Sequence, residues 1–245
     1  MKRFKPWELF EINKELSIQK VRIDEFLILI IDNFYVDPTS IRNYILEAPL
    51  PIWKYTDSTL NFKQYYDCRH IISFYKNPPY VDALDNIISH YYNFILKKNK
   101  NYSFITNVFQ WKDDQPAMTV GNRTHTDGLN VVANNIFLNL EEECSGGTAI
   151  YRSKLSNSCD VRQTENWEEY ADNYNIHEDG SVYYDISWPD HWFIETIIPM
   201  KFNRCIIYPG YLFHGAYHTD NNFKNYPRVG QTCFLESELP EIKEK

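Results

Sequence analysis

The chain has 245 residues, of which 43% are hydrophobic and 24% are charged, and its formal net charge is −8. This is the composition of a globular protein that buries a core, and it excludes a disordered chain. Lysine and arginine form only short runs, at residues 2–5 and 97–100, so the charge balance argues against a nucleic-acid partner. The longest apolar run, residues 26–31, is too short to cross a bilayer, and residues 1–17 lack the apolar segment of a signal peptide. We therefore expect a cytoplasmic protein that does not associate with membranes.

The five cysteines are odd in number and include no C-x-x-C pair, so the sequence indicates neither a disulfide framework nor a zinc ribbon. Cys205 and Cys233 lie inside apolar runs and are expected to be thiols of the core.

The first hundred residues predict a mixed α/β part, residues 1–101. Residues 1–25 are read as a polar lead-in, and residues 26–31 as a strand. Asp37 followed by a proline predicts the start of a helix that ends before Pro49, and the prolines at 78–79 predict the start of a second helix.

From about residue 102 the pattern changes to short segments rich in β-branched and aromatic residues, separated by turn-forming residues. Such spacing predicts a β-sandwich or a double-sheet barrel within a single domain that spans residues 1–245, with its core at 102–236. The polar stretch 153–189 is long for a loop and predicts a lid, a small helical insert or a disordered excursion, with helical turns at 167–170. The expected strands are 103–111, 118–121, 129–140, 147–152, 192–198, 205–208 and 229–235.

Three residues of this half could bind a metal. His125 and Asp127 form an H-x-D motif, and His214 follows a strand and a Pro-Gly turn. Residues i and i+2 of a strand point to one face, so His125 and Asp127 can reach the same ion. Two imidazoles and a carboxylate on one face of a divalent metal are the ligand set of non-haem Fe(II) oxygenases. Arg228 opens the last strand, and its planar guanidinium could bind a carboxylate of a cosubstrate in a bidentate manner.

The order of these residues resembles the Fe(II)/2-oxoglutarate-dependent dioxygenases, most closely a prolyl-hydroxylase-like branch, over roughly residues 102–236. The segment Gly146-Gly147-Thr148 is similar to the GGT strand of that family, and residues 213–216 (FHGA) are similar to its distal-histidine segment. The resemblance implies an α+β, mainly β fold: a double-stranded β-helix (jelly-roll) core with N-terminal helices packed on the major sheet.

The same resemblance implies that His125, Asp127 and His214 ligate Fe(II), that Arg228 pairs with the distal carboxylate of 2-oxoglutarate, and that O2 is the co-oxidant. The spacing from His214 to Arg228 is longer than is usual in the family, which leaves His218 as an alternative distal ligand. Many members carry a serine two residues after the arginine, where this chain has Gly230, so another residue must supply a hydroxyl to the cosubstrate. The candidates for that hydroxyl are Tyr208, Tyr151 and Thr232.

The sequence and the resemblance together therefore predict an oxygenase that hydroxylates a C–H bond of an amino acid, a peptide or a small natural product. An intact carboxylate at Asp127 argues against halogenation, because related halogenases have a small residue there. Two alternatives remain open: a cupin-like hydrolase or isomerase that holds Zn²⁺ with the same three residues, and a non-enzymatic jelly-roll binding module. The sequence leaves the prime substrate and the oligomeric state open.

Overall fold

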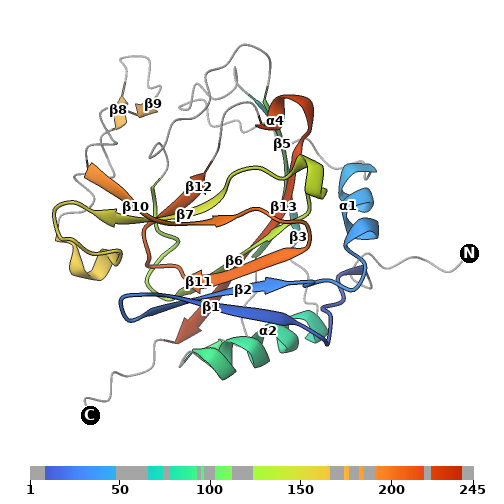
Figure 1. Ribbon diagram of the computed structural model, residues 1–245, viewed down its shortest axis with the longest axis horizontal. Helices are drawn as coiled ribbons and strands as arrows, with labels where there is room; N and C mark the ends of the chain where they lie inside the picture. Colours follow the sequence, from blue (N-terminus) through green and yellow to red (C-terminus); the bar gives the residue numbers. More distant parts are fainter. Residues whose placement is uncertain are drawn as a thin grey trace, which may run out of the picture.

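The protein is mainly β, with two antiparallel sheets as its main layers (Figure 1). We describe it from a computed structural model. Among the described residues, no helix combines the length and the apolar character needed to cross a membrane. The structure describes residues 9–47, 66–73, 78–92, 95–96, 103–111, 124–165, 174–176, 182–184, 191–217 and 222–238.

The larger sheet is eight-stranded among the described residues and runs in the order β1-β2-β11-β6-β13-β5-β3, with β4 paired to β13 off this path. Its strands are β1 (Ser17–Ile23), β2 (Phe26–Asp32), β3 (Tyr66–Ser73), β4 (Ile95–Leu96), β5 (Ser103–Trp111), β6 (Val131–Phe137), β11 (Arg204–Pro209) and β13 (Arg228–Glu238).

The smaller sheet consists of β10 (Trp192–Pro199), β7 (Gly147–Ser153) and β12 (His214–Tyr217), in that order. A single bridge between His125 and His214 adds one further antiparallel pair to β12. Because β12 also pairs with β7 through His214 and Ile150, this bridge lies on its other edge. The segment at His125 thus takes the place of a fourth strand.

The strands from β10 to β13 return antiparallel along the segments from β5 to β7, and each return segment pairs with its counterpart in reverse order. β10 pairs with β7, β11 with β6, His214 with His125, and β13 with β5. The segments from β5 to β13 therefore form one long hairpin, and its strand pairs are distributed between the two sheets. The hairpin turns around in the insert between β7 and β10, which holds a 3-10 turn (Val161–Gln163) and the short strands β8 (Tyr174–Ile176) and β9 (Val182–Tyr184).

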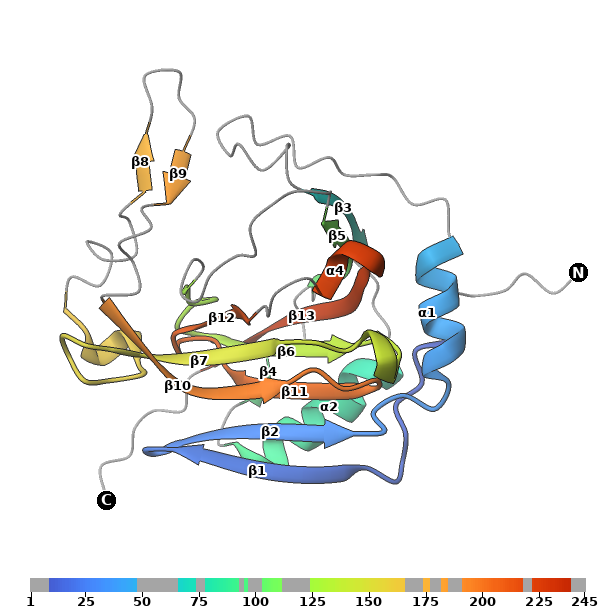
Figure 2. The ribbon, with the colours of Figure 1, turned by 45° about the horizontal axis from the view of Figure 1, so that its top comes forward.

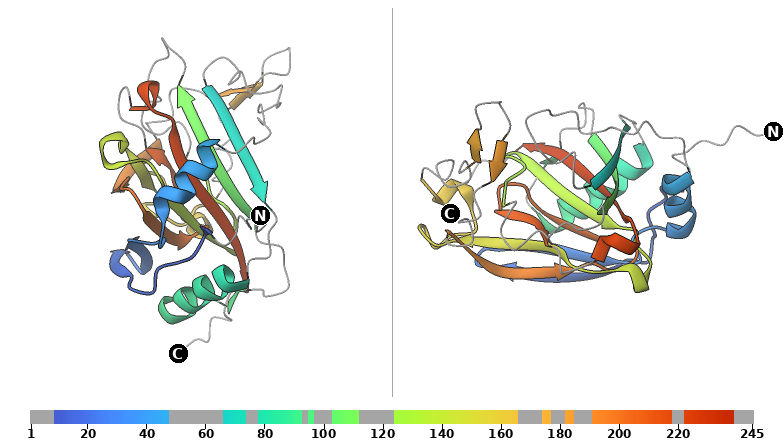
Figure 3. Two further views of the ribbon diagram at one scale, coloured as in Figure 1. Left: turned by 90° about the vertical axis from the view of Figure 1, so that its right-hand side faces the viewer. Right: turned by 90° about the horizontal axis from the view of Figure 1, so that it is seen from above.

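The insert and the first helix lie at opposite ends of the sheets. Figure 2 shows β8 and β9 rising away from the two sheets, and both Figure 2 and the right view of Figure 3 place α1 (Pro38–Glu47) at the other end. Asp37 caps α1, because its Oδ1 accepts a hydrogen bond of 3.0 Å from the Ser40 N–H. The other α-helices among the described residues are α2 (Pro78–Tyr91) and α4 (Asn222–Asn225), and a second 3-10 turn spans Glu141–Glu143.

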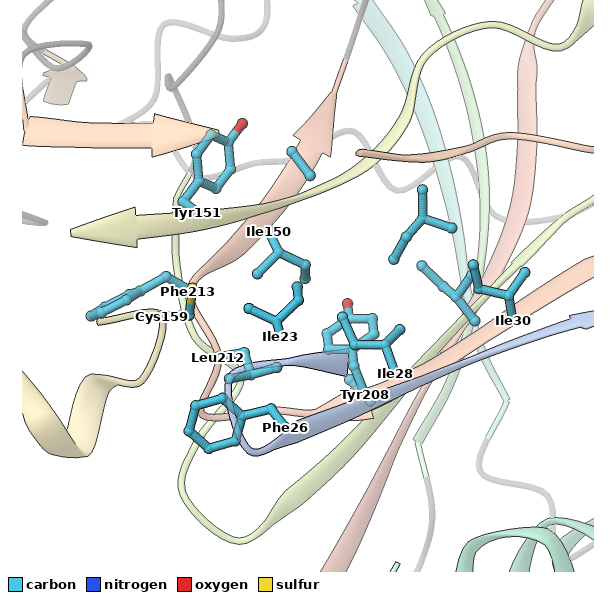
Figure 4. Packing of buried hydrophobic residues seen from close by; sticks show 14 of the residues in the cluster. Ile23, Phe26, Ile28, Ile30, Ile150, Tyr151, Cys159, Tyr208, Leu212 and Phe213 are labelled. Atoms are coloured by element: carbon cyan, nitrogen blue, oxygen red, sulfur yellow. The ribbon is translucent and has the colours of Figure 1, made fainter. Parts of the chain in front are cut away.

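The strands β2, β6 and β11 of the larger sheet are buried on both faces, and alternate residues of these strands enter two different cores. One core contains Val132 and Ile136 of β6 together with buried residues of both long helices, such as Ile41 and Leu84. The other core lies between the two sheets and contains Ala133 and Phe137 of the same strand; Figure 4 shows part of it around Tyr208. Burial on both faces explains the nearly continuous apolar runs of these strands.

Several expectations from the sequence are confirmed. The apolar run 26–31 is a strand, the first helix begins after Asp37, the second helix begins at Pro78, and Cys205 and Cys233 are fully buried.

Others were wrong. The supposed polar lead-in contains β1, and the strand β3 was not predicted. The strand expected at 129–140 is shorter, because residues 129–130 form a turn and a 3-10 turn follows at Glu141–Glu143. The expected strand at 118–121 and the helical turns at 167–170 lie outside the described residues.

The approach of β10 to the start of β7 provides a test of the packing between them. A Cβ atom on Gly147 would lie 2.1 Å from the carbonyl oxygen of Ile198, so a side chain there must push the two strands apart. We expect Gly147→Ala to lower the free energy of unfolding by about 4 kcal/mol, which corresponds to a fall in melting temperature of about 10 °C. Thermal unfolding followed by circular dichroism measures the change.

Gly230→Ala is the matched control, because its new Cβ would lie 3.1 Å from the carbonyl oxygen of Ile136 and a small adjustment relieves that contact. We expect it to cost about 1 kcal/mol. Equal melting temperatures for the two variants would show that β7 and β10 are not packed this closely.

Candidate metal centre

The centre is built on the single bridge between His125 and His214. The His125 N–H donates to the His214 carbonyl oxygen at 2.9 Å, and the His214 N–H donates to the His125 carbonyl oxygen at 3.0 Å. Two residues that exchange both bonds are directly opposite in an antiparallel ladder, with side chains on the same face and Cα atoms about 5.5 Å apart. The two imidazole rings accordingly lie with their centroids 4.4 Å apart.

Asp127 is held beside these rings by a separate backbone contact. Its N–H donates to the carbonyl oxygen of Gly210 at 2.8 Å, in the turn that leads from β11 to β12. Its carboxylate oxygens then lie 3.1 Å from Nε2 of His214 and 3.7 Å from Nε2 of His125. One ligand atom from each of the three residues lies within 4.8 Å of the other two, a spacing that allows a single ion to contact all three.

The orientation of His214 leaves one ring nitrogen available to an ion. Its Nδ1 lies 2.8 Å from the carbonyl oxygen of Leu212. A carbonyl oxygen only accepts hydrogen bonds, so Nδ1 is protonated, and Nε2 is the ring nitrogen that faces Asp127. This is the arrangement by which a second contact fixes the tautomer of a metal-binding histidine. The ring of Tyr208 packs edge-on against the imidazole, 4.7 Å between centroids.

The electrostatics of Asp127 favour a bound cation. Burial raises the pKa of this carboxyl, but the charge of His214, a hydrogen bond from that imidazole and the charge of His125 outweigh burial and hold the pKa below 3.8. The group is therefore ionised at neutral pH, although only 9% of its side chain is exposed. A buried carboxylate with two imidazole nitrogens pointing at it is a donor set that fits a divalent transition metal.

Arg228 is the first residue of β13, as the sequence predicted. Its strand alternates between the two cores: Val229 is in the core beneath the helices, whereas Phe234 packs against the core between the sheets. Arg228 and Thr232 share the face of Phe234, because side chains alternate along a strand, and that face is turned toward the smaller sheet. The expectation that residues 228, 230 and 232 share a face is thus confirmed.

The hydroxyl of Tyr208 is close enough to both Asp127 and Arg228 for their charges to act on it. Burial raises the pKa of its phenol well above the usual value, the charge of Asp127 raises it further, and the positive charge of Arg228 opposes this. Both charges therefore act on the same hydroxyl. The Tyr208 oxygen accepts a hydrogen bond of 3.0 Å from the side-chain amide of Asn135 on the neighbouring strand.

The remaining candidates are placed elsewhere. Tyr151 lies in β7, where its N–H bonds the carbonyl oxygen of Phe213 at 2.8 Å, and its side chain is buried in the core between the sheets. His218, the alternative distal ligand, lies outside the described residues. Reasoning from the sequence missed Asn135, although the two amides in the otherwise apolar run of β6, Asn134 and Asn135, were a visible signal.

A comparison with protein families shows the family to which the chain belongs. Residues 83–232, more than half of its length, match the model of a family described as "Family of unknown function (DUF6445)", and the chain belongs to this family. The matched range includes His125, Asp127, His214 and Arg228. No curated protein matches the chain.

The metal site predicts a selective effect of removing His125. This side chain is 52% exposed, so His125→Ala removes a ligand at little cost in stability. We expect the affinity for Fe(II), or for Co(II) as an air-stable substitute, to fall at least about 100-fold, because even the loss of a group outside the ligand sphere costs 10- to 100-fold. Isothermal titration calorimetry of the metal-free protein measures the affinity.

Thr126→Ala is the matched control, since Thr126 lies between the two ligands of the H-x-D motif and is not among the three clustered groups. It should bind metal like the wild type. An unchanged affinity in His125→Ala would exclude this triad as the metal site.

Proposed function

We propose that the protein is a non-haem Fe(II)- and 2-oxoglutarate-dependent oxygenase that acts in the cytoplasm and hydroxylates a C–H bond of an amino acid, a peptide or a small natural product. The observation that carries the proposal is the clustering of His125, Asp127 and His214, together with Arg228 on the face of β13 that is turned toward the smaller sheet. Neither feature alone distinguishes an oxygenase from another metalloprotein. Together they supply a site for the metal and a cation for a dicarboxylate cosubstrate.

The order of the strands supports a jelly-roll (double-stranded β-helix) core. A jelly roll is a pair of packed antiparallel sheets formed by a long hairpin that winds up on itself. The pairing of β5 with β13, of His125 with His214, of β6 with β11 and of β7 with β10 has that pattern. The shared core of the helices and the larger sheet supports the proposal that the N-terminal helices pack on its outer face.

When bound, Fe(II) with 2-oxoglutarate and O2 supplies the oxidising power needed to hydroxylate an unactivated C–H bond. His125, Asp127 and His214 would hold the metal from one side and leave its other positions open. The half-exposed ring of His125 marks the accessible side of the site, whereas His214 is buried behind it.

Arg228 would bind the distal carboxylate of 2-oxoglutarate, and Tyr208 would donate a second hydrogen bond to it. Burial keeps the Tyr208 phenol protonated at neutral pH. Its oxygen already accepts from Asn135, so the hydroxyl hydrogen can be donated to an anion near Arg228. Thr232 lies on the same face of β13 and is a further hydroxyl candidate.

An anaerobic titration of the metal-free protein with Fe(II) and then 2-oxoglutarate tests the proposal. The wild type should develop the weak visible charge-transfer band of a chelated 2-oxo acid. Asp127→Ala should abolish the band, and Arg228→Ala should weaken 2-oxoglutarate binding at least about tenfold, because a charge-assisted hydrogen bond contributes about 1.5–3 kcal/mol. Arg152→Ala, which removes an arginine paired with Asp24 and Glu195, should leave the titration unchanged.

Two outcomes would contradict the proposal that the protein is an oxygenase. If metal binds but no band forms, the three ligands serve a different chemistry, and a cupin-like hydrolase or isomerase takes its place. If no metal binds, the protein is a jelly-roll binding module.

A further inference from the structure

We propose that Asn139 is a positioning residue for Arg228: its side-chain amide holds the backbone on both sides of the arginine and so sets where the guanidinium points. The inference rests on the proposed function, in which Arg228 binds 2-oxoglutarate. Asn139 itself does not touch the cosubstrate in this proposal.

The contacts of Asn139 bracket Arg228 along the chain. The Val229 N–H donates to Oδ1 of Asn139 at 2.8 Å, and Nδ2 of Asn139 donates to the carbonyl oxygen of Pro227 at 2.8 Å. These are the backbone groups immediately after and immediately before Arg228. The side chain of Asn139 is fully buried, so water does not compete for either bond.

The amide is needed because strand β6 ends too early to pair with β13 at this point. The last pair of the ladder joins Phe137 to Gly230, and one more backbone bond runs from the Leu138 N–H to the Val229 carbonyl oxygen, at 2.9 Å. A side-chain amide carries the same donor and acceptor as a peptide group. Asn139 therefore continues the ladder by one step, opposite the edge on which Arg228 pairs with Phe109 of β5.

A second set of contacts fixes the amide itself. Glu143 is buried, and its Oε2 accepts from the Leu140 N–H at 3.0 Å and lies 3.4 Å from Nδ2 of Asn139. Arg42 of α1 neutralises this carboxylate through Nη2, at 2.7 and 2.9 Å from its two oxygens. An amide turned the other way would place its oxygen against the oxygens of Glu143 and Pro227, so only one orientation is allowed.

The consequence is a selective defect. Without the Asn139 amide, the backbone on both sides of Arg228 loses these two hydrogen bonds. The position of the guanidinium is then less well defined. The metal ligands are anchored to the His125–His214 bridge instead, so their geometry does not depend on Asn139. We therefore expect 2-oxoglutarate affinity to fall about tenfold in Asn139→Ala, the size expected for one net buried hydrogen bond, while Fe(II) affinity is retained.

The experiment is a double-mutant cycle on full-length protein, with 2-oxoglutarate affinity read from the charge-transfer band and Fe(II) affinity from calorimetry. The variants are Asn139→Ala, Arg228→Ala and both together. If Asn139 acts through Arg228, then removing Asn139 costs nothing further once Arg228 is absent. Pyruvate, a 2-oxo acid without the distal carboxylate, should bind equally to wild type and Asn139→Ala. If Asn139→Ala does not fold, Asn139→Asp is used in its place. This variant keeps the volume but places an oxygen against the carbonyl oxygen of Pro227, so it should show the same defect more strongly.

A control with the same chemistry separates positioning from general stability. Asn203 binds the backbone of Tyr35 in the same way, with its Oδ1 accepting from the N–H at 2.8 Å and its Nδ2 donating to the carbonyl oxygen at 2.9 Å. Its φ is 58°, so Asn203→Gly removes both bonds without backbone strain. This variant should lose stability but bind 2-oxoglutarate like the wild type.

The outcomes separate the two proposals. Additive losses in the cycle, or an equal loss of pyruvate binding, would overturn the role of Asn139 while leaving the oxygenase intact. Absence of the band in the wild type would overturn both.

Discussion

The two backbone hydrogen bonds between His125 and His214 are the constraint on which the rest of the centre depends. They join segments that are far apart in the sequence and set both imidazoles on one face of the smaller sheet. One residue pair suffices because its neighbours are fixed independently. His214 continues into β12, which pairs with β7, and Asp127 is tied to Gly210. Gly210 has no room for a side chain, since a Cβ there would lie 2.9 Å from the carbonyl oxygen of Val131. The H-x-D segment and the turn before β12 are thus locked together through backbone contacts.

This arrangement places a carboxylate where water cannot solvate it well. The carboxylate of Asp127 is ionised although little of it is exposed, and an uncompensated buried charge is costly. A divalent cation would balance this charge and would contact one ring nitrogen of His125 and one of His214 at the same time. The unequal exposure of the two rings follows from the fold. His214 opens β12, which pairs with β7 on one edge and meets His125 on the other, whereas the described segment at His125 is joined to the sheet through this single bridge.

The sequence predicted the principal site residues but not the contacts that place them. The H-x-D spacing, the distal histidine and the arginine that opens the last strand are local patterns. The structure brings His125, Asp127 and His214 together. The strand β1 was missed because it lies at the edge of the sheet and alternates poorly, with Ile23 its only buried residue. Asn139 had no local signal either, since its role depends on a strand about ninety residues further along the chain and on where β6 ends.

The site residues lie where regular strand pairing ends, and geometry gives the reason. Within a ladder, side chains stand perpendicular to the sheet and those on one face lie about 5 Å or more apart, so a regular ladder brings few of them to a single small ligand. At strand ends the chain can turn, and backbone groups released from the ladder need other partners. Here Gly210 provides one such partner to Asp127, and Asn139 provides two around Arg228. The interior of the same strands carries the two cores, which make the larger sheet rigid. A rigid sheet whose ends are tied by single, directional hydrogen bonds can hold a metal and an anion-binding cation at a fixed separation.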